Sequence, residues 1–116
     1  MASASDAKYA AALKINPDDH EALNNWGNTL LAQARTKTGA MADRLFKQAG
    51  EKYAAALKIK PDDAEVLDSL GSLYLFWSRI KKSNVAKRLY ATAEKKLLKA
   101  EKISKGTASY NLACLA

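Results

Sequence analysis

The octapeptide KYAAALKI occurs twice in the chain, at residues 8–15 and 52–59. The two copies begin 44 residues apart, and residues 8–51 align with residues 52–95 without gaps at 21 identical positions. A partial third copy begins with the stretch at residues 96–103. Self-similarity at a fixed period is typical of proteins that are built from stacked structural repeats. The sequence therefore predicts a duplicated unit of 44 residues.

The composition favours helices over strands. Alanine and leucine supply 38 of the 116 residues, whereas valine and isoleucine together supply six. Alanine and leucine lose little conformational freedom in a helix, and β-branched residues lose more. Apolar residues also recur at spacings of three, four and seven, which is typical of one face of a helix. We expect six helices, at residues 5–15, 19–36, 40–59, 63–80, 85–103 and 108–116.

Two clusters of proline and aspartate mark the boundaries between units. Pro17 and Pro61 each follow a predicted helix, and proline cannot continue a helix and restricts the residue before it. The pairs at residues 18–19 and 62–63 are both Asp-Asp, which can cap the positive end of the next helix. Each repeat is therefore expected to begin directly after its proline.

The apolar positions resemble those of the tetratricopeptide repeat (TPR), a helical hairpin with small and aromatic residues at fixed positions. In the first unit the matching residues are Leu23, Trp26, Gly27, Leu30, Ala49, Tyr53, Ala56 and Pro61. In the second unit they are Leu67, Leu70, Gly71, Tyr74, Ala93, Leu97 and Ala100. The aromatic residues among them, together with Tyr9 upstream, are expected to be core residues.

The resemblance implies an all-α fold, a right-handed superhelical array of antiparallel helix hairpins (an α-solenoid). It implies one domain over residues 1–116, with a half repeat, two full repeats and the start of a further repeat at residues 1–17, 18–61, 62–105 and 106–116. The period of 44 residues departs from the 34 of the family. Ten additional residues split across a hairpin lengthen each helix by about five residues, or about 7–8 Å. Such long-helix units resemble the plant mitochondrial import receptor of this family more than its short-repeat chaperone adaptors.

In the TPR family, the first helices of successive repeats line a concave groove that holds a peptide or a helix of a partner. Carried onto this chain, the resemblance implies a groove formed by Asn24, Asn28, Leu31, Arg35, Asp68, Ser72, Phe76 and Arg79. Asparagine can bond a ligand backbone as donor and acceptor, and arginines one repeat apart could hold an acidic group. Asn24 and Asp68 stand where the chaperone-tail clamp of some members has lysine, which argues against chaperone C-termini as ligands. We expect a non-catalytic scaffold that binds a protein or peptide and needs no cofactor.

Positive charge is concentrated in the second half of the chain. The formal net charge is +7, and residues 79–105 contain ten Lys or Arg against two acids. A basic face on the fifth predicted helix consists of Lys87, Arg88, Lys95, Lys99 and Lys102. Such a face can bind an acidic protein, nucleic acid or an anionic membrane, or it can simply keep the helix solvated. Aromatic residues that would stack on single-stranded nucleic acid are missing there apart from Tyr90.

The sequence has no arrangement typical of an enzyme or a metal site. His20 is the only histidine and Cys114 the only cysteine, which is too few for a zinc site. No secretory signal or membrane-spanning apolar stretch is recognisable, so we expect a cytoplasmic protein. The last segment would leave an uncapped apolar edge formed by Tyr110, Leu112, Cys114 and Leu115. Self-association through open repeat ends is therefore a further expectation.

Overall fold

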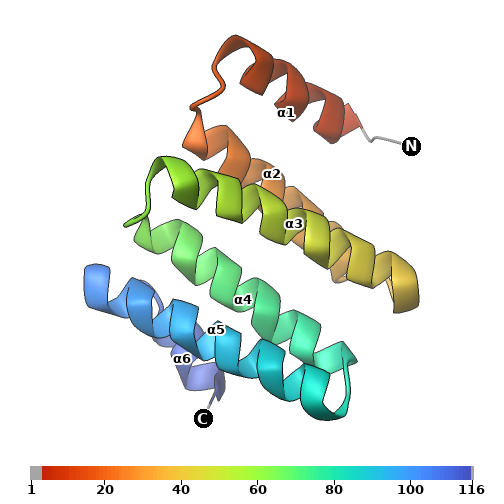
Figure 1. Cartoon of the computed structure of the whole chain (residues 1–116), viewed down its shortest axis with the longest axis vertical. Helices are drawn as coiled ribbons and strands as arrows, with labels where there is room; N and C mark the ends of the chain where they lie inside the picture. The colour runs from red at the N-terminus through yellow and green to blue at the C-terminus, as the bar shows by residue number, and fades with distance from the viewer. Residues whose placement is uncertain (1–3, 116) are drawn as a thin grey trace. The chain divides into compact units, whose positions relative to one another are not determined.

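The computed structural model describes residues 4–115, and this part of the chain is built from helices alone (Figure 1). Its helices are Ala4–Ile15 (α1), His20–Ala34 (α2), Gly39–Ile59 (α3), Ala64–Ile80 (α4), Ser83–Ile103 (α5) and Ser109–Leu115 (α6). The all-α class is confirmed, and the six predicted helices agree with the observed ones to within two residues at each described end. Residues 1–3 of the predicted half repeat and Ala116 of the last predicted helix lie outside the described residues.

The aspartates after the prolines start the following helices. The Asp19 carboxylate accepts a hydrogen bond of 3.1 Å from the backbone N–H of Ala22, at the beginning of α2. The Asp63 carboxylate accepts one of 3.3 Å from Val66 at the beginning of α4. A side-chain oxygen at this position satisfies an amide that the helix itself leaves unpaired. The capping role predicted for the Asp-Asp pairs is therefore confirmed, and in each pair the second Asp is the cap.

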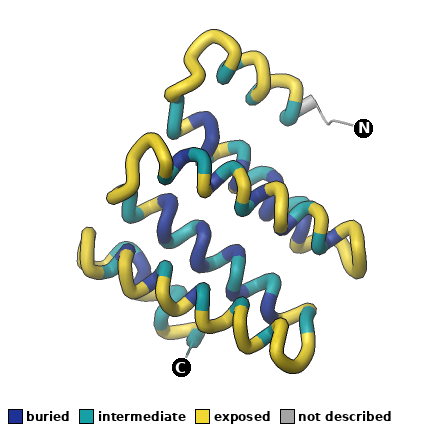
Figure 2. The backbone as a smooth tube through the Cα atoms, viewed as in Figure 1, coloured by how far each residue is buried: buried dark blue, intermediate teal, exposed yellow. Residues whose placement is uncertain are grey.

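The chain forms two compact units that meet in sequence at the predicted repeat boundary. Unit 1 extends to Pro61 and contains α1, α2 and α3, and unit 2 begins at Asp62 and contains α4, α5 and α6. In each unit the paired helices, α2 with α3 and α4 with α5, share most of the contacts. The buried side chains lie mainly on these pairs, while α1 is half-buried or exposed from residue 5 to residue 15 (Figure 2).

A glycine at the same repeat position brings the paired helices close together in both units. A Cβ atom on Gly27 would lie 2.7 Å from Cε1 of Tyr53, and one on Gly71 would lie 2.5 Å from Cγ of Leu97. Tyr53 and Leu97 are both fully buried. Only glycine leaves room for a large side chain at this contact, so the small residue of the repeat signature has a packing reason.

In unit 2 the short helix α6 is held by polar contacts to its neighbours. The side-chain amide of Asn111 donates a hydrogen bond of 3.0 Å to the Asp68 carboxylate of α4. The Tyr90 hydroxyl of α5 donates to the backbone oxygen of Leu115. The carboxylate of Glu101 accepts hydrogen bonds from the backbone N–H groups of Gly106 and Ala108, which closes the turn between α5 and α6.

Candidate functional site

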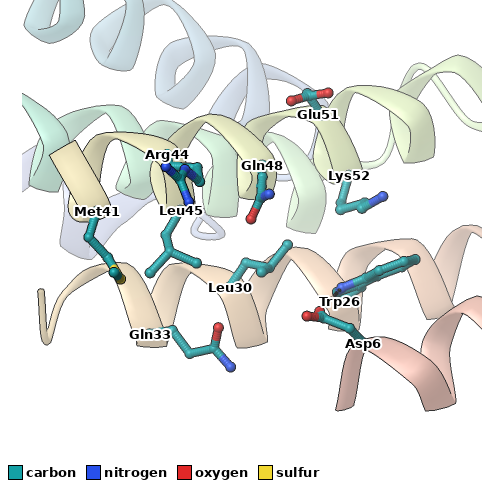
Figure 3. Close-up of a pocket in the computed structure, with 10 residues that line it drawn as sticks. All are labelled: Asp6, Trp26, Leu30, Gln33, Met41, Arg44, Leu45, Gln48, Glu51 and Lys52. Atoms are coloured by element: carbon teal, nitrogen blue, oxygen red, sulfur yellow. Dashed lines mark hydrogen bonds between the residues drawn. The ribbon is translucent and has the colours of Figure 1, made fainter. Parts of the chain in front are cut away.

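Unit 1 contains a half-open hollow of about 620 Å³ along the pair of α2 and α3 (Figure 3). Three of its lining residues come from α2, six from α3 and one from α1. They are Trp26, Leu30 and Gln33; Met41, Arg44, Leu45, Gln48, Glu51 and Lys52; and Asp6. The size is in the range of sites that bind small molecules or several side chains of a peptide.

The walls of the hollow follow the helical repeat. Trp26, Leu30 and Gln33 are spaced i, i+4, i+7 on α2, and Met41, Leu45, Gln48 and Lys52 are spaced i, i+4, i+7, i+11 on α3. Residues at these spacings share one face of a helix. At 1.5 Å per residue, the row on α3 is about 16 Å long, or about three turns. The hollow is thus elongated and lies between two antiparallel rows of side chains.

Trp26 is held in a fixed orientation at one end of the hollow. Its indole N–H donates a hydrogen bond of 2.6 Å to the Asp6 carboxylate of α1. The ring of Tyr9 stacks on it at 6.0 Å between ring centroids. On the α3 side, Nζ of Lys52 lies 3.8 Å from the centroid of the Trp26 ring. A cation over an indole face and a charged hydrogen-bond acceptor both stabilise this arrangement.

Apolar side chains line the middle of the hollow and the end opposite Trp26. Leu30 is almost fully buried, Leu45 is half-buried and points from α3 towards α2, and Met41 is 53% exposed (Figure 3). Methionine is flexible and polarizable, so an exposed Met41 can adapt to different apolar partners. The hollow therefore offers an apolar floor with an adaptable rim.

The charges around the hollow are balanced. Asp6 and Glu51 oppose Arg44 and Lys52, although the whole chain has a formal net charge of +7. Two of the four, Asp6 and Lys52, are already engaged with Trp26. The site is consequently suited to a ligand that binds through apolar contacts rather than through charge attraction.

The groove residues predicted on α2 have different surroundings from one another. The Oδ1 atom of Asn28 accepts a hydrogen bond of 2.5 Å from the Tyr53 hydroxyl. Oδ1 of Asn24 is buried and accepts no hydrogen bond from the described residues. Leu31 is 9% exposed and belongs to the core, and Arg35 is exposed directly after α2. These four residues are not among the ten that line the hollow in Figure 3.

The groove residues predicted on α4 belong to unit 2. Burial raises the pKa of the Asp68 carboxyl above its ordinary value, the hydrogen bond from Asn111 opposes this, and the charge of Glu101 adds to it. The Arg79 guanidinium lies 5.3 Å from the centroid of the Phe76 ring, and Ser72 is half-buried. The predicted groove combines residues of both units, and it stays a prediction.

All five residues of the basic face, Lys87, Arg88, Lys95, Lys99 and Lys102, are exposed on α5. The buried residues of the same helix are Ala93, Leu97 and Ala100, and they occupy the opposite side. The basic face therefore lies on the exposed side of α5 and extends over about 22 Å from Lys87 to Lys102 at 1.5 Å per residue.

Within residues 4–115 the structure contains no cluster of three or more His, Cys, Asp or Glu side chains that could hold a metal ion. Cys114 is exposed. None of the helices within residues 4–115 is both long and apolar enough to cross a bilayer.

The sequence pattern does not indicate the hollow, because its residues also fit core or surface positions of the paired helices. Trp26 was predicted to be a core residue but is half-buried, as are Tyr9 and Tyr74, and only Tyr53 of the four signature aromatics is fully buried. Helix α3 has a row of buried core residues and, beside it, a second row that lines the hollow and begins with Met41 and Leu45. An exposed methionine four residues before a leucine is the signal that could have indicated it.

The comparison with protein families gives one match that covers nearly the whole chain. The family described as the plant specific mitochondrial import receptor subunit TOM20 matches residues 3–113. Neither the curated proteins nor the solved structures contain a match. The likeness of the long-helix units to a plant mitochondrial import receptor is thus confirmed, and the family is one of receptors rather than enzymes.

Two predictions are corrected by this match. Membership in the TPR family is wrong, because the matching family is TOM20. The 44-residue period was the physical sign of the difference, since the second helix of each pair, α3 or α5, is 21 residues long. The cytoplasmic localisation is also wrong, because the matching family is one of mitochondrial import receptor subunits.

Proposed function

The chain belongs to the family of the plant specific mitochondrial import receptor subunit TOM20, and we propose that it binds a targeting segment of proteins to be imported. A receptor for import must meet its ligands on the outer side of the organelle, so we place the chain at the mitochondrial surface. The binding site proposed here is the hollow of unit 1. The right-handed superhelical array and the single domain predicted from the repeats are kept as part of this proposal.

The observation that carries the proposal is the pair of rows along α2 and α3. Mitochondrial targeting segments are amphipathic helices rich in Arg and poor in acids. An amphipathic helix binds a groove through apolar side chains at i, i+3, i+4 and i+7. The hollow presents Trp26, Leu30, Leu45 and Met41 along about three helical turns, which matches the apolar stripe of such a ligand.

Apolar contact, rather than attraction between opposite charges, would supply the affinity. The hollow has balanced charge and the chain is basic, so a basic ligand gains no net Coulomb attraction. Three apolar side chains of the ligand that become buried contribute about 1.5–3 kcal/mol each, or about 4.5–9 kcal/mol together, and association costs at least about 4 kcal/mol. At most about 5 kcal/mol remains, so the expected dissociation constant is about 0.2 mM or weaker, which permits rapid release.

The second repeat supplies a variant that fills the hollow. The residues 44 positions after Leu30 and Gln33 are Tyr74 and Trp77, whose rings stack at 6.4 Å between centroids. The double variant Leu30→Tyr with Gln33→Trp introduces the residues of the second repeat into unit 1. It places two large rings in the hollow, at repeat positions that hold the same rings in unit 2. The isotope-labelled chain is titrated with an acid-free amphipathic peptide, and chemical-shift changes are followed at the residues of the hollow. These changes should occur in the parent chain and disappear in the filled variant.

The matched control is the reverse exchange in unit 2, Tyr74→Leu with Trp77→Gln, which should leave peptide binding in unit 1 unchanged. Both variants are first checked for unchanged cooperative unfolding. Equal binding by the filled variant and the parent chain would contradict the hollow as the site.

The groove predicted from the resemblance is a second candidate surface for the same ligand. Its support is the buried, unbonded acceptor of Asn24, which could receive a hydrogen bond from a ligand. The double variant Asn24→Ala with Arg79→Ala tests it, because Asn28 already accepts the hydrogen bond of the buried Tyr53 hydroxyl. Loss of peptide binding in this variant, with binding retained in the filled variant, would move the site from the hollow to the predicted groove.

A further inference from the structure

The basic face on α5 can be compared with the equivalent positions on α3, because the two helices occupy the same place in successive repeats. The five positions of the basic face on α5 correspond, 44 residues earlier, to Asp43, Arg44, Glu51, Ala55 and Lys58 on α3. The row on α3 has two acids and two bases and is neutral, whereas the row on α5 has five bases. Both helices are 21 residues long and pair with the preceding helix of their unit. Solvation of such a helix therefore does not require a purely cationic row.

The acids of α5 do not neutralise the basic face. The carboxylate of Glu101 is occupied by the backbone N–H groups of Gly106 and Ala108. Glu94 is exposed and lies seven residues after Lys87, at almost the same angle around the helix, so it offsets one of the five positive charges. The row keeps an excess of positive charge on exposed side chains, which is available to a partner.

We propose that the basic face binds the anionic surface of a lipid membrane. The row contains four lysines and one arginine, and lysine is a point charge without the planar fork that arginine offers to a single carboxylate or phosphate. A straight row on one helix fits a flat array of charged headgroups, and clusters of four to eight Lys or Arg on an amphipathic helix are typical of binding to anionic lipid.

An exposed leucine accompanies the lysines. Leu98 is 54% exposed and lies three residues after Lys95 and four before Lys102, within one turn of both. The corresponding residue on α3 is Ala54. Apolar side chains beside a basic row can enter the headgroup region and add to electrostatic attraction. The leucine therefore favours a membrane over nucleic acid or an acidic protein.

The choice of a membrane rests in part on the proposed function, since a mitochondrial import receptor works beside one. The geometry of the basic face does not involve the hollow, which lies in unit 1. The two proposals can therefore fail separately. A parent chain that binds the peptide but not anionic vesicles would overturn only the membrane proposal.

The test is sedimentation of the full chain with vesicles of phosphatidylcholine containing about 30% phosphatidylinositol, compared with pure phosphatidylcholine. Lys87→Asp, Lys95→Glu and Lys99→Ala together install the α3 residues in α5 and change the net charge from +7 to +2. We expect this triple variant to bind anionic vesicles at least about 100-fold more weakly than the parent chain. Leu98→Ala should weaken binding only a few-fold.

The control variant has the same net charge of +2 but keeps the basic face. It changes five exposed lysines of unit 1 to glutamine, at Lys8, Lys14, Lys37, Lys47 and Lys60. This variant should keep most of the vesicle binding. Equal losses in both variants would show a response to net charge alone and overturn the proposal. Binding to duplex DNA or an acidic peptide without binding to anionic vesicles would also overturn it.

Discussion

The ammonium group of Lys52 lies 3.8 Å from the centroid of the Trp26 ring, and this contact closes one end of the hollow in unit 1. The second repeat keeps the lysine, as Lys96, but has Leu70 in place of the tryptophan. The contact is therefore particular to the first repeat. Because Asp6 and Tyr9 hold the same indole from the other side, Trp26 joins α1 to the pair of α2 and α3.

Replacement of Trp26 by leucine should release α1 while the paired helices stay folded. The variant loses the hydrogen bond to Asp6 and the ring contacts to Tyr9 and Lys52. We expect α1 to lose about 2 kcal/mol of docking free energy, since a hydrogen bond to a charged group alone contributes about 1.5–3 kcal/mol. Hydrogen exchange of residues 4–15 should become about 30-fold faster, with α3 protected as before. Equal acceleration in α1 and α3 would contradict a local role for Trp26.

Addition of a methyl group at Gly27 should destabilise unit 1 through Tyr53. The Cβ of Gly27→Ala would lie 2.7 Å from a ring carbon of a fully buried side chain. Overpacking of this kind costs about 1–3 kcal/mol in the free energy of unfolding, which urea denaturation measures. In a Tyr53→Ala background the ring is gone, so the same change should cost much less. Additive effects of the two substitutions would show that the clash is not the cause.

The carboxyl of Asp68 should make stability decrease as pH rises. Burial raises its pKa in the folded state above the ordinary value of 3.8, so the folded chain holds this proton more tightly than the unfolded chain. Stability contributed by protonation is present below pH 3.8 and is lost as pH rises through the folded pKa. Asp68→Asn, which installs the residue of the first repeat, cannot titrate.

Urea denaturation of both proteins at a series of pH values checks this sign. The free energy of unfolding of Asp68→Asn, relative to the parent chain, should increase from about pH 4 upwards and then level off. Asn111→Ala removes the hydrogen bond that opposes the shift, so it should enlarge the pH dependence. Parallel pH profiles for the parent chain and Asp68→Asn would contradict the assignment.

Salt should separate the two proposed binding activities. The chain and a basic targeting peptide repel each other, and apolar contacts hold them together, so peptide binding should persist or strengthen between about 0.05 and 0.5 M salt. Binding of anionic vesicles by the basic face should fall steeply over the same range, because exposed charges are screened. Isothermal titration for the peptide and vesicle sedimentation provide the two measurements. Peptide binding that weakens with salt would show that charge, not apolar contact, carries it.

Much of the fold follows from local signals in the sequence. The helix ends were predictable because Pro17, Pro61 and the capping Asp19 and Asp63 act on their immediate neighbours. The repeat signature likewise marked Gly27 and Gly71 as positions for a small residue. These features need only spacing and backbone chemistry, and both can be read along the chain.

The candidate site could not be predicted in the same way. Its shape depends on a side of α3 that remains open beside Met41 and Leu45, and on the approach of Asp6 from α1. Both are consequences of packing between distant segments. The half-burial of Trp26 has the same origin, since its indole is divided between α1 and α3.

Met41 offers the most direct measurement of the central claim, that a targeting segment binds in the hollow. The chain has two methionines, so labelling of methionine methyl groups produces few signals, and the side chain of Met41 lines the hollow. A spin label on an acid-free amphipathic peptide should broaden the Met41 methyl signal, and excess unlabelled peptide should restore it. If this peptide binds the chain and leaves the Met41 signal unchanged, the hollow is not the binding site.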